Sequence, residues 1–257
     1  MASPKRYAVV SCHVERPLDD RVWERFAALQ LARPGGFAIA ALIRPPDPVA
    51  GEDAGVWLAR AREAAGRGPF GHHTHWTAPD HARPTDDLDP AARVRGESVW
   101  LREQGLEPTL FCGGGWYSDL GVAEACADLG YVDCTATAYR PAYLPPDAPR
   151  LGLAAPASVI LPSGARLLEL PSTHSLGMLA REVLAPGGLR SELVHVHVHD
   201  TDLVDTRRRL ALVWALRALA RRRQATDLDA LAAAVRDAAP DIPFAELIRT
   251  EIIAPGG

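Results

Sequence analysis

The chain has 257 residues, of which 47% are hydrophobic and 23% are charged, and its formal net charge at pH 7 is -4. This is an ordinary globular composition, and the small negative charge gives no support for nucleic-acid binding, which needs a basic surface. No run approaches the roughly 20 apolar residues of a membrane span. The first ten residues also lack the apolar stretch of a secretory signal, so we expect a cytoplasmic protein. In that compartment the cysteines, Cys12, Cys112, Cys126 and Cys134, are expected to be free thiols.

Strand-like and helix-like segments alternate from the N-terminus, judged from short β-rich runs and from apolar residues at helical spacing. The expected strands cover residues 7–13, 37–44, 70–75, 109–112, 131–138 and 193–199. The expected helices cover about 19–33, 53–67, 90–104, 118–130, 203–223 and 227–238. Residues 139–165 are rich in proline and alanine and look irregular, with a hairpin expected between 158–161 and 166–170.

This alternation indicates βαβ units and a parallel sheet, hence an α/β fold. About seven β/α units in 257 residues favour a single domain built as a distorted or incomplete (β/α) barrel of about seven parallel strands. An open doubly wound sheet is the alternative. No GxGxxG follows a strand and no P-loop is present, so the nucleotide-binding versions of that sheet lack their phosphate-binding loop.

Three histidines stand within four positions at the end of the third expected strand. Residues two apart in a strand point the same way, so His73 and His75 can face one metal ion while His72 points to the opposite side. Imidazole is the commonest protein ligand of zinc and similar ions, and two of them supply half a coordination shell. An inert polar loop is the alternative explanation.

The last expected strand carries a second set of histidines in the alternating run Leu193–His199. His195 and His197 fit packed core positions, which would need hydrogen-bond partners. His199 falls at the C-terminal rim, where the active sites of β/α barrels lie. There it can serve as a general acid or base, with Asp200 or Asp202 on its second nitrogen.

His13 and Glu15 end the first expected strand and share a face by the same argument. A carboxylate beside two imidazoles completes a two-histidine, one-carboxylate metal site with open positions for water and substrate. Glu15, His73 and His75 are therefore the candidate ligands.

Candidate substrate-binding residues follow the fourth expected strand and the hairpin. Consecutive glycines permit close backbone approach to a ligand, and their amides are candidates for an oxyanion site, while two aromatic residues offer faces that stack on sugars. These residues are Gly113, Gly114, Gly115, Trp116 and Tyr117, together with Trp76 after the histidine motif. A tight turn with buried aromatics is the alternative. His174 lies in a polar loop and is a further candidate for this rim, unless the loop is only a helix N-cap.

In this order, the segments resemble the polysaccharide deacetylase (NodB-homology) family of distorted (β/α) barrels, from about residue 7 to the helix after His199. The resemblance implies hydrolysis of an N-acetyl group by a water that a divalent metal activates. Glu15, His73 and His75 then match the metal ligands, His199 matches the general acid, and the three glycines match the family's glycine motif. The histidine motif here has the form HxH in place of the commoner HxxxH. The implied metal is Zn²⁺, with Co²⁺ or Mn²⁺ as alternatives.

Two positions depart from the family pattern. His13 stands where the family has its aspartate base, and it can either replace that base or act as a fourth ligand. Cys112 stands where an arginine is expected, which removes the partner that orients the base. A softer metal site made of Cys12, His13 and Cys112 is a further, less favoured hypothesis.

The sequence thus predicts a metal-dependent hydrolase that removes an acyl group from an amide on a small-molecule or lipid-linked carbohydrate. A non-catalytic carbohydrate-binding protein with the same fold is one alternative. Another barrel metallohydrolase, such as an amidohydrolase, is a second, although that group usually has its HxH at the first strand. The sequence does not predict an oligomeric state.

Overall fold

The computed structural model describes residues 6–85, 89–145, 148–185 and 187–249. Its longer strands are β1 (Tyr7–Val14), β2 (Ala40–Ile43), β3 (Phe70–Thr74), β4 (Leu110–Gly113), β7 (Ala157–Ile160), β8 (Arg166–Glu169) and β10 (Leu193–His199). Its helices are α1 (Asp20–Ala32), α2 (Ala54–Ala65), α3 (Pro90–Glu103), α4 (Leu120–Leu129), α5 (Leu176–Leu184), α6 (Thr206–Ala220) and α7 (Leu228–Val235). Short strands are β5 (Val132–Asp133), β6 (Arg150–Leu151), β9 (His174–Ser175), β11 (Gln224–Ala225), β12 (Asp241–Pro243) and β13 (Ile248–Arg249).

One large sheet of 11 strands forms the centre of the molecule, in the order β12-β7-β8-β5-β4-β3-β2-β1-β10-β9, with β11 beside β1. Every pairing in it is parallel except that between β7 and β8. Within the described ranges no pairing joins β9 to β12, so the sheet curves without closing. The α/β fold and the incomplete barrel predicted from the sequence are confirmed, as is the hairpin after residue 157, and the sheet has more strands than expected.

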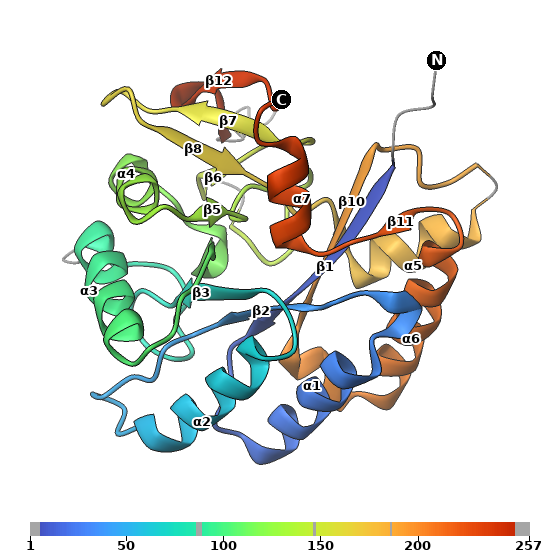
Figure 1. The fold of residues 1–257 in the computed structure, drawn as a ribbon, viewed down its shortest axis with the longest axis horizontal. Coiled ribbons are helices and arrows are strands. Elements are labelled where there is room, and N and C mark those ends of the chain that lie inside the picture. Colours follow the sequence, from blue (N-terminus) through green and yellow to red (C-terminus); the bar gives the residue numbers. More distant parts are fainter. Residues whose placement is uncertain (1–5, 86–88, 146–147, 186, 250–257) are drawn as a thin grey trace, which may run out of the picture.

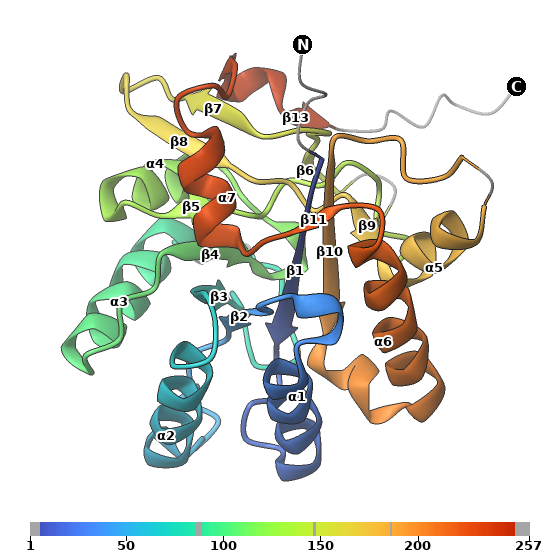
Figure 2. The same ribbon diagram turned by 45° about the vertical axis from the view of Figure 1, so that its right-hand side comes forward.

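Helices cover the outer face of the sheet, and α7 lies on its inner face (Figure 1, Figure 2). Val10 and Val196 face outward and pack with Phe26 of α1 and Leu212 of α6 in one core cluster. Residues one position along the same strands, such as Val9, point inward, where α7 contributes three side chains. The inner set comprises Val9, Leu42, Leu110, Val132 and Leu168 from the sheet with Leu228, Leu231 and Ala232 from α7.

Aspartate side chains begin six of the seven helices in the described chain. Each accepts hydrogen bonds from backbone N–H groups of the first turn, which otherwise lack partners. These N-caps are Asp19, Asp53, Asp89, Asp119, Asp205 and Asp227, and Ser175 serves α5. The acidic residues that open these segments in the sequence thus have a local structural role.

Some element boundaries differ from the sequence prediction. The expected strand 131–138 is only two residues long, because Asp133 accepts hydrogen bonds from the backbone N–H and the hydroxyl of Thr135 and turns the chain. The expected helix 203–223 begins at Thr206, after a 3-10 turn over Asp200–Val204. Strand β9 was not predicted, whereas helix α5, with Ser175 as its N-cap, agrees with the alternative interpretation of the loop around His174 as a helix N-cap.

All four cysteines are buried free thiols, as expected. None of the helices in the described ranges is long and apolar enough to cross a membrane.

Candidate metal centre

The ends of β1, β3 and β10 bring the predicted site residues together on the inner face of the sheet. His13 and His199 are Cα partners in the pairing of β1 with β10. On β3, His73 points inward, whereas His72 points outward and contacts Glu97 of α3, with Nε2 2.7 Å from Oε2. The predicted division of these two histidines between opposite faces is confirmed.

Glu15 lies at the centre of three imidazoles. Its Oε1 is 3.9 Å from Nε2 of His73, 3.6 Å from Nε2 of His75 and 3.7 Å from Nε2 of His199. His73 and His75 are buried, whereas 28% of the Glu15 side chain and 23% of the His199 side chain are exposed. The four side chains therefore converge on one place that remains open to solvent on one side.

The second nitrogens of the two buried imidazoles define their tautomers. Nδ1 of His73 lies 2.8 Å from the carbonyl oxygen of Cys112, and Nδ1 of His75 lies 2.8 Å from that of Pro79. A carbonyl only accepts, so each Nδ1 carries the proton and donates it, and each Nε2 has a free lone pair. Backbone partners of this kind orient histidine ligands in metal sites.

The donor set fits a divalent metal ion. Both Nε2 atoms are buried and have no hydrogen-bond partner among the described residues. Such an atom costs free energy unless something binds it. A tetrahedral ion with ligand bonds of roughly 2.0–2.2 Å holds its ligand atoms about 3.3–3.6 Å apart, close to the spacing seen here. Glu15, His73 and His75 are the residues that would hold it.

Burial, together with the nearby His75 and against the opposing effect of Glu15, lowers the pKa of His73 to about 4. His73 is therefore neutral near pH 7. Neutral imidazole is the form that binds metal ions, so the protonation state agrees with the tautomer.

His13 is buried beside this group. Its ring centroid is 4.7 Å from that of His73, 5.0 Å from that of Trp116 and 5.2 Å from that of His199. Its Nε2 is 3.7 Å from Sγ of Cys112. Burial, reinforced by the neighbouring histidines, lowers the pKa of His13 well below its usual value, so this imidazole is neutral.

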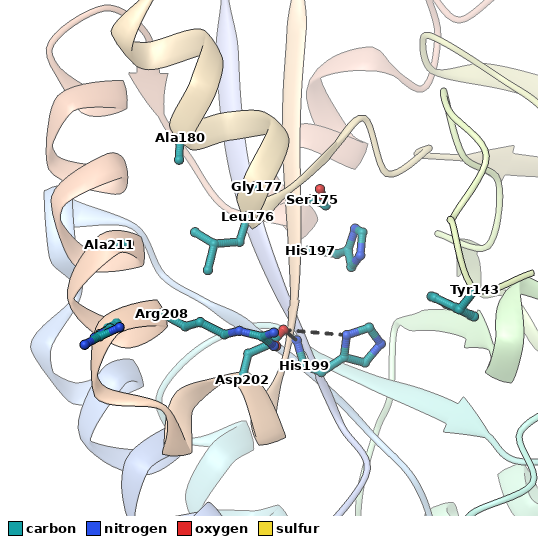
Figure 3. A pocket seen from close by; sticks show the side chains of 11 residues that line it. Tyr143, Ser175, Leu176, Gly177, Ala180, His197, His199, Asp202, Arg208 and Ala211 are labelled. Carbon is teal, nitrogen blue, oxygen red and sulfur yellow. Dashed lines mark hydrogen bonds and ion pairs between the residues drawn. The ribbon is translucent and has the colours of Figure 1, made fainter.

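The two acidic residues near His199 have different surroundings. Asp202 Oδ2 lies 3.9 Å from Nδ1 of His199, and its carboxylate also pairs with Arg208 (Figure 3). Asp200 instead accepts the backbone N–H groups of Arg16 and Thr201, both at 2.8 Å. Burial raises the pKa of Asp200 to about 6. Of the two residues, Asp202 is the one that faces the second nitrogen of His199.

Two cavities meet at His199 and Tyr143, which line both. The smaller, of about 270 Å³, is bounded by His13, Glu15 and His73. The larger, of about 560 Å³, lies between α5 and α6, with His197 and His199 pointing from β10 toward Tyr143 (Figure 3). Its other lining residues are Ser175, Leu176, Gly177, Ala180, Asp202, Arg207, Arg208 and Ala211. A substrate could occupy both cavities at once, with His199 at the junction.

The glycine turn after β4 packs tightly against the histidine motif. A Cβ on Gly114 would lie 2.5 Å from the carbonyl oxygen of Thr74 and 2.9 Å from Cδ2 of His75, so only glycine permits this approach. The N–H of Gly113 donates to Oγ1 of Thr135, which leaves it unavailable to an oxyanion. Trp116 has a positive φ of 57°, a strained conformation for a bulky residue, and its side chain lines the smaller cavity.

Gly113, Gly115 and Trp116 thus reach the cavity, but the other four predicted substrate-binding residues, Gly114, Trp76, Tyr117 and His174, do not line it. Trp76 is fully buried, donates from Nε1 to the carbonyl of Gly114 and lines no described cavity. The hydroxyl of Tyr117 donates to Asp119. His174 is the Cα partner of Val196, so it shares that residue's outward face, and its Nε2 lies 3.1 Å from Glu182 of α5.

Sequence reasoning missed Tyr143 and Tyr139, which come from the segment called irregular. Tyr143 lines both cavities, and the hydroxyl of Tyr139 lies 3.0 Å from Nδ1 of His197. His195 is bonded at both nitrogens, to the Ser11 hydroxyl and to backbone carbonyls, which is the core role expected for it. The proline-rich composition around the tyrosines carries no periodic signal that could have placed them.

No protein-family model matches the chain, and no curated protein matches it. Among solved structures, a 4-alpha-glucanotransferase from Thermococcus litoralis matches with a TM-score of 0.54 and 10% identity. That match covers 93% of this chain, which spans 42% of the glucanotransferase chain. A family 4 carbohydrate esterase from Streptomyces lividans matches with a TM-score of 0.43 and 10% identity, over 85% of this chain and 88% of that one. At this identity the first match shows a shared fold alone.

Proposed function

We propose that this protein is a metal-dependent hydrolase that cleaves an N-acyl bond, such as an N-acetyl amide, in a small-molecule or lipid-linked carbohydrate. The observation that carries the proposal is the convergence of Glu15 with the unpartnered Nε2 atoms of His73 and His75. This set leaves positions open for water and substrate, as catalytic metal sites do. The sugar class rests on the resemblance to polysaccharide deacetylases, with carbohydrate-processing proteins among the structural matches.

A bound Zn²⁺, Co²⁺ or Mn²⁺ ion would polarise the acyl carbonyl and activate a water molecule. His13 and His199 line the cavity beside the ligands and are the candidates to move protons. His13 is neutral, so it is in the form that accepts a proton from the attacking water.

His199 is placed to protonate the leaving amine. It stands between the smaller cavity, where the ligands lie, and the larger one between α5 and α6. Its Nε2 faces Glu15, and the Asp202 carboxylate lies 3.9 Å from its Nδ1. We assign the acyl group to the smaller cavity and the amine-bearing sugar to the larger one. Asp200 acts by holding the backbone beside Glu15 rather than by moving a proton.

The environment of His13 favours a second candidate function, a carbohydrate-binding protein without catalysis. Burial and the adjacent histidines lower the pKa of His13 well below its usual value, which weakens it as a base. The Cys112 sulfur at 3.7 Å is a poor substitute for a charged partner that would orient it.

Metal content tests the first proposal. Wild-type protein is expected to hold about one divalent ion per chain by elemental analysis, and Glu15→Ala and His73→Ala are expected to lose it. His81→Ala is the control, because the His81 side chain is exposed and pairs with Asp80. Unchanged metal in the first two variants would refute the site.

Incubation of the metal-loaded protein with N-acetyl sugars then separates the two functions. Acetate release supports the hydrolase. Binding of sugar without acetate release supports the binding protein.

A further inference from the structure

His13, His73 and Cys112 form a second group of potential metal ligands. One nitrogen of each ring and the Cys112 sulfur lie within 4.8 Å of one another. All three residues are buried, and His13 and His73 also line the smaller cavity, which gives an ion a route in. Cys12 takes no part, because it belongs to the outer core cluster and its Sγ lies near the carbonyl of His13.

The two ligand groups differ in chemical softness. The group containing Glu15 offers a carboxylate, which suits harder ions such as Mn²⁺. The group containing Cys112 offers a thiolate, which favours zinc, cadmium and other softer ions. His73 belongs to both groups.

His73 has only one ring nitrogen with which it can bind a metal ion in either ligand group. Its Nδ1 donates to the carbonyl of Cys112, so Nε2 is the atom left to bind an ion. That atom has no hydrogen-bond partner among the described residues. A single lone pair serves one ion at a time, so the two positions exclude each other.

We propose that the protein has a second, softer metal position formed by His13, His73 and Cys112, which takes a thiolate-binding ion in place of the ion at Glu15. The Cys112 thiol loses its proton to solvent, and the sulfur electron pair forms the bond to the ion. Sγ of Cys112 lies 3.7 Å from Nε2 of His13, so the sulfur and this nitrogen are close enough to bind one ion. The choice of ion thus decides whether Glu15 is a ligand or a free carboxylate. This inference does not require hydrolytic activity.

Metal-free full-length protein titrated with Cd²⁺ tests the position, because cadmium bound to a thiolate gives a near-ultraviolet charge-transfer absorption. One Cd²⁺ per chain is expected, with the absorption lost in Cys112→Ser and kept in Cys126→Ser, a control at a buried cysteine of α4 outside the group. Cys112→Ser should weaken Cd²⁺ binding by at least roughly tenfold, since even indirect partners of a metal change its affinity by about 10–100-fold.

Mn²⁺ binding, followed by electron paramagnetic resonance, is expected to show the opposite dependence. Glu15→Gln should weaken it, and Cys112→Ser should leave it within about twofold, a change of less than roughly 0.5 kcal/mol. In wild-type protein Cd²⁺ should displace Mn²⁺, a measurement that needs no variant to fold.

No thiolate absorption in the wild-type protein, or an absorption that survives Cys112→Ser, would overturn the proposal. Simultaneous binding of Cd²⁺ and Mn²⁺ would overturn the shared use of His73. If the wild-type protein binds Cd²⁺ with the thiolate signal but binds no Mn²⁺, the softer position stands and the assignment of Glu15 as a metal ligand fails.

Discussion

Two fully buried carboxyl groups on neighbouring strands lead to a prediction about stability and pH. Asp133 of β5 and Glu169 of β8 are Cα partners, and one oxygen of each carboxyl group, Oδ2 and Oε2, is buried without a hydrogen-bond partner among the described residues. A proton held between the two groups would satisfy both oxygens, which two carboxylates could not do for each other. Burial, followed by the charge of Asp133, raises the pKa of Glu169 well above its usual value, so Glu169 holds that proton.

The sign of the effect follows from linkage between protonation and folding. Above pH 4.5, the ordinary value for Glu169, the unfolded chain has released the proton that the folded chain keeps. The free energy of unfolding therefore falls as the pH rises toward the raised pKa, by about 1.4 kcal/mol per pH unit for one proton. Glu169→Gln replaces the carboxyl with an amide that donates to Asp133 without titrating.

Urea unfolding of the wild-type protein and of Glu169→Gln, measured at pH 5 and pH 6, tests this. The variant should gain about 1.4 kcal/mol relative to the wild type over that interval, whatever its stability at pH 5. Glu103→Gln, at an exposed residue of α3, is the control and should show no such gain. If the difference between wild type and Glu169→Gln is the same at both pH values, the shared proton is refuted.

Three further outcomes are expected. Gly114→Ala should lower the free energy of unfolding in urea by about 1–3 kcal/mol, because the added Cβ would clash with Thr74 and His75. Gly96→Ala in α3 is the matched variant: its Cβ would have open space, so the substitution should raise the free energy of unfolding by about 0.5–1 kcal/mol. Removing the metal with a chelator should lower the melting temperature of the wild-type protein, since an ion at 100 times its Kd adds about 2.7 kcal/mol to the free energy of unfolding. If the chelator lowers the melting temperature of His73→Ala by the same amount, the effect does not come from this metal site. His199→Gln should keep its metal content and lose about 100-fold or more in hydrolysis rate, and a loss of metal would show that it is a ligand instead.

The placement of the candidate ligands could be predicted because they lie in or directly after strands. Alternation along a strand determines which side chains share a face, and parallel strands end at the same edge of a sheet. These two rules place Glu15 beside His73 and His75 and put His72 on the opposite face. Both can be applied from the local sequence once β1 and β3 are predicted to be parallel.

The remaining features depend on contacts that no local pattern encodes. Asp133 and Glu169 meet because β8 pairs with β5 after an irregular segment, and that register is visible only in the fold. The glycine turn was interpreted as a ligand-binding loop, whereas the main requirement at Gly114 is the close approach of Thr74 and His75. For His174 the sequence leaves both a rim position and a helix N-cap loop open, because its strand partner, Val196, and hence its outward direction, is visible only in the fold.

The hydrogen bond from the Arg16 N–H to Asp200 joins segments 184 residues apart in the chain. One segment follows Glu15 and the other follows His199, so a single buried carboxylate ties the backbone beside the central ligand to the backbone beside the candidate acid. If one segment moved without the other, the Asp200 carboxylate would lose the hydrogen bond from the Arg16 N–H while it remains buried, which costs free energy. Glu15 and His199 are therefore expected to move as one rigid unit, so any adjustment of the cavity to a substrate falls to other lining residues such as Tyr143.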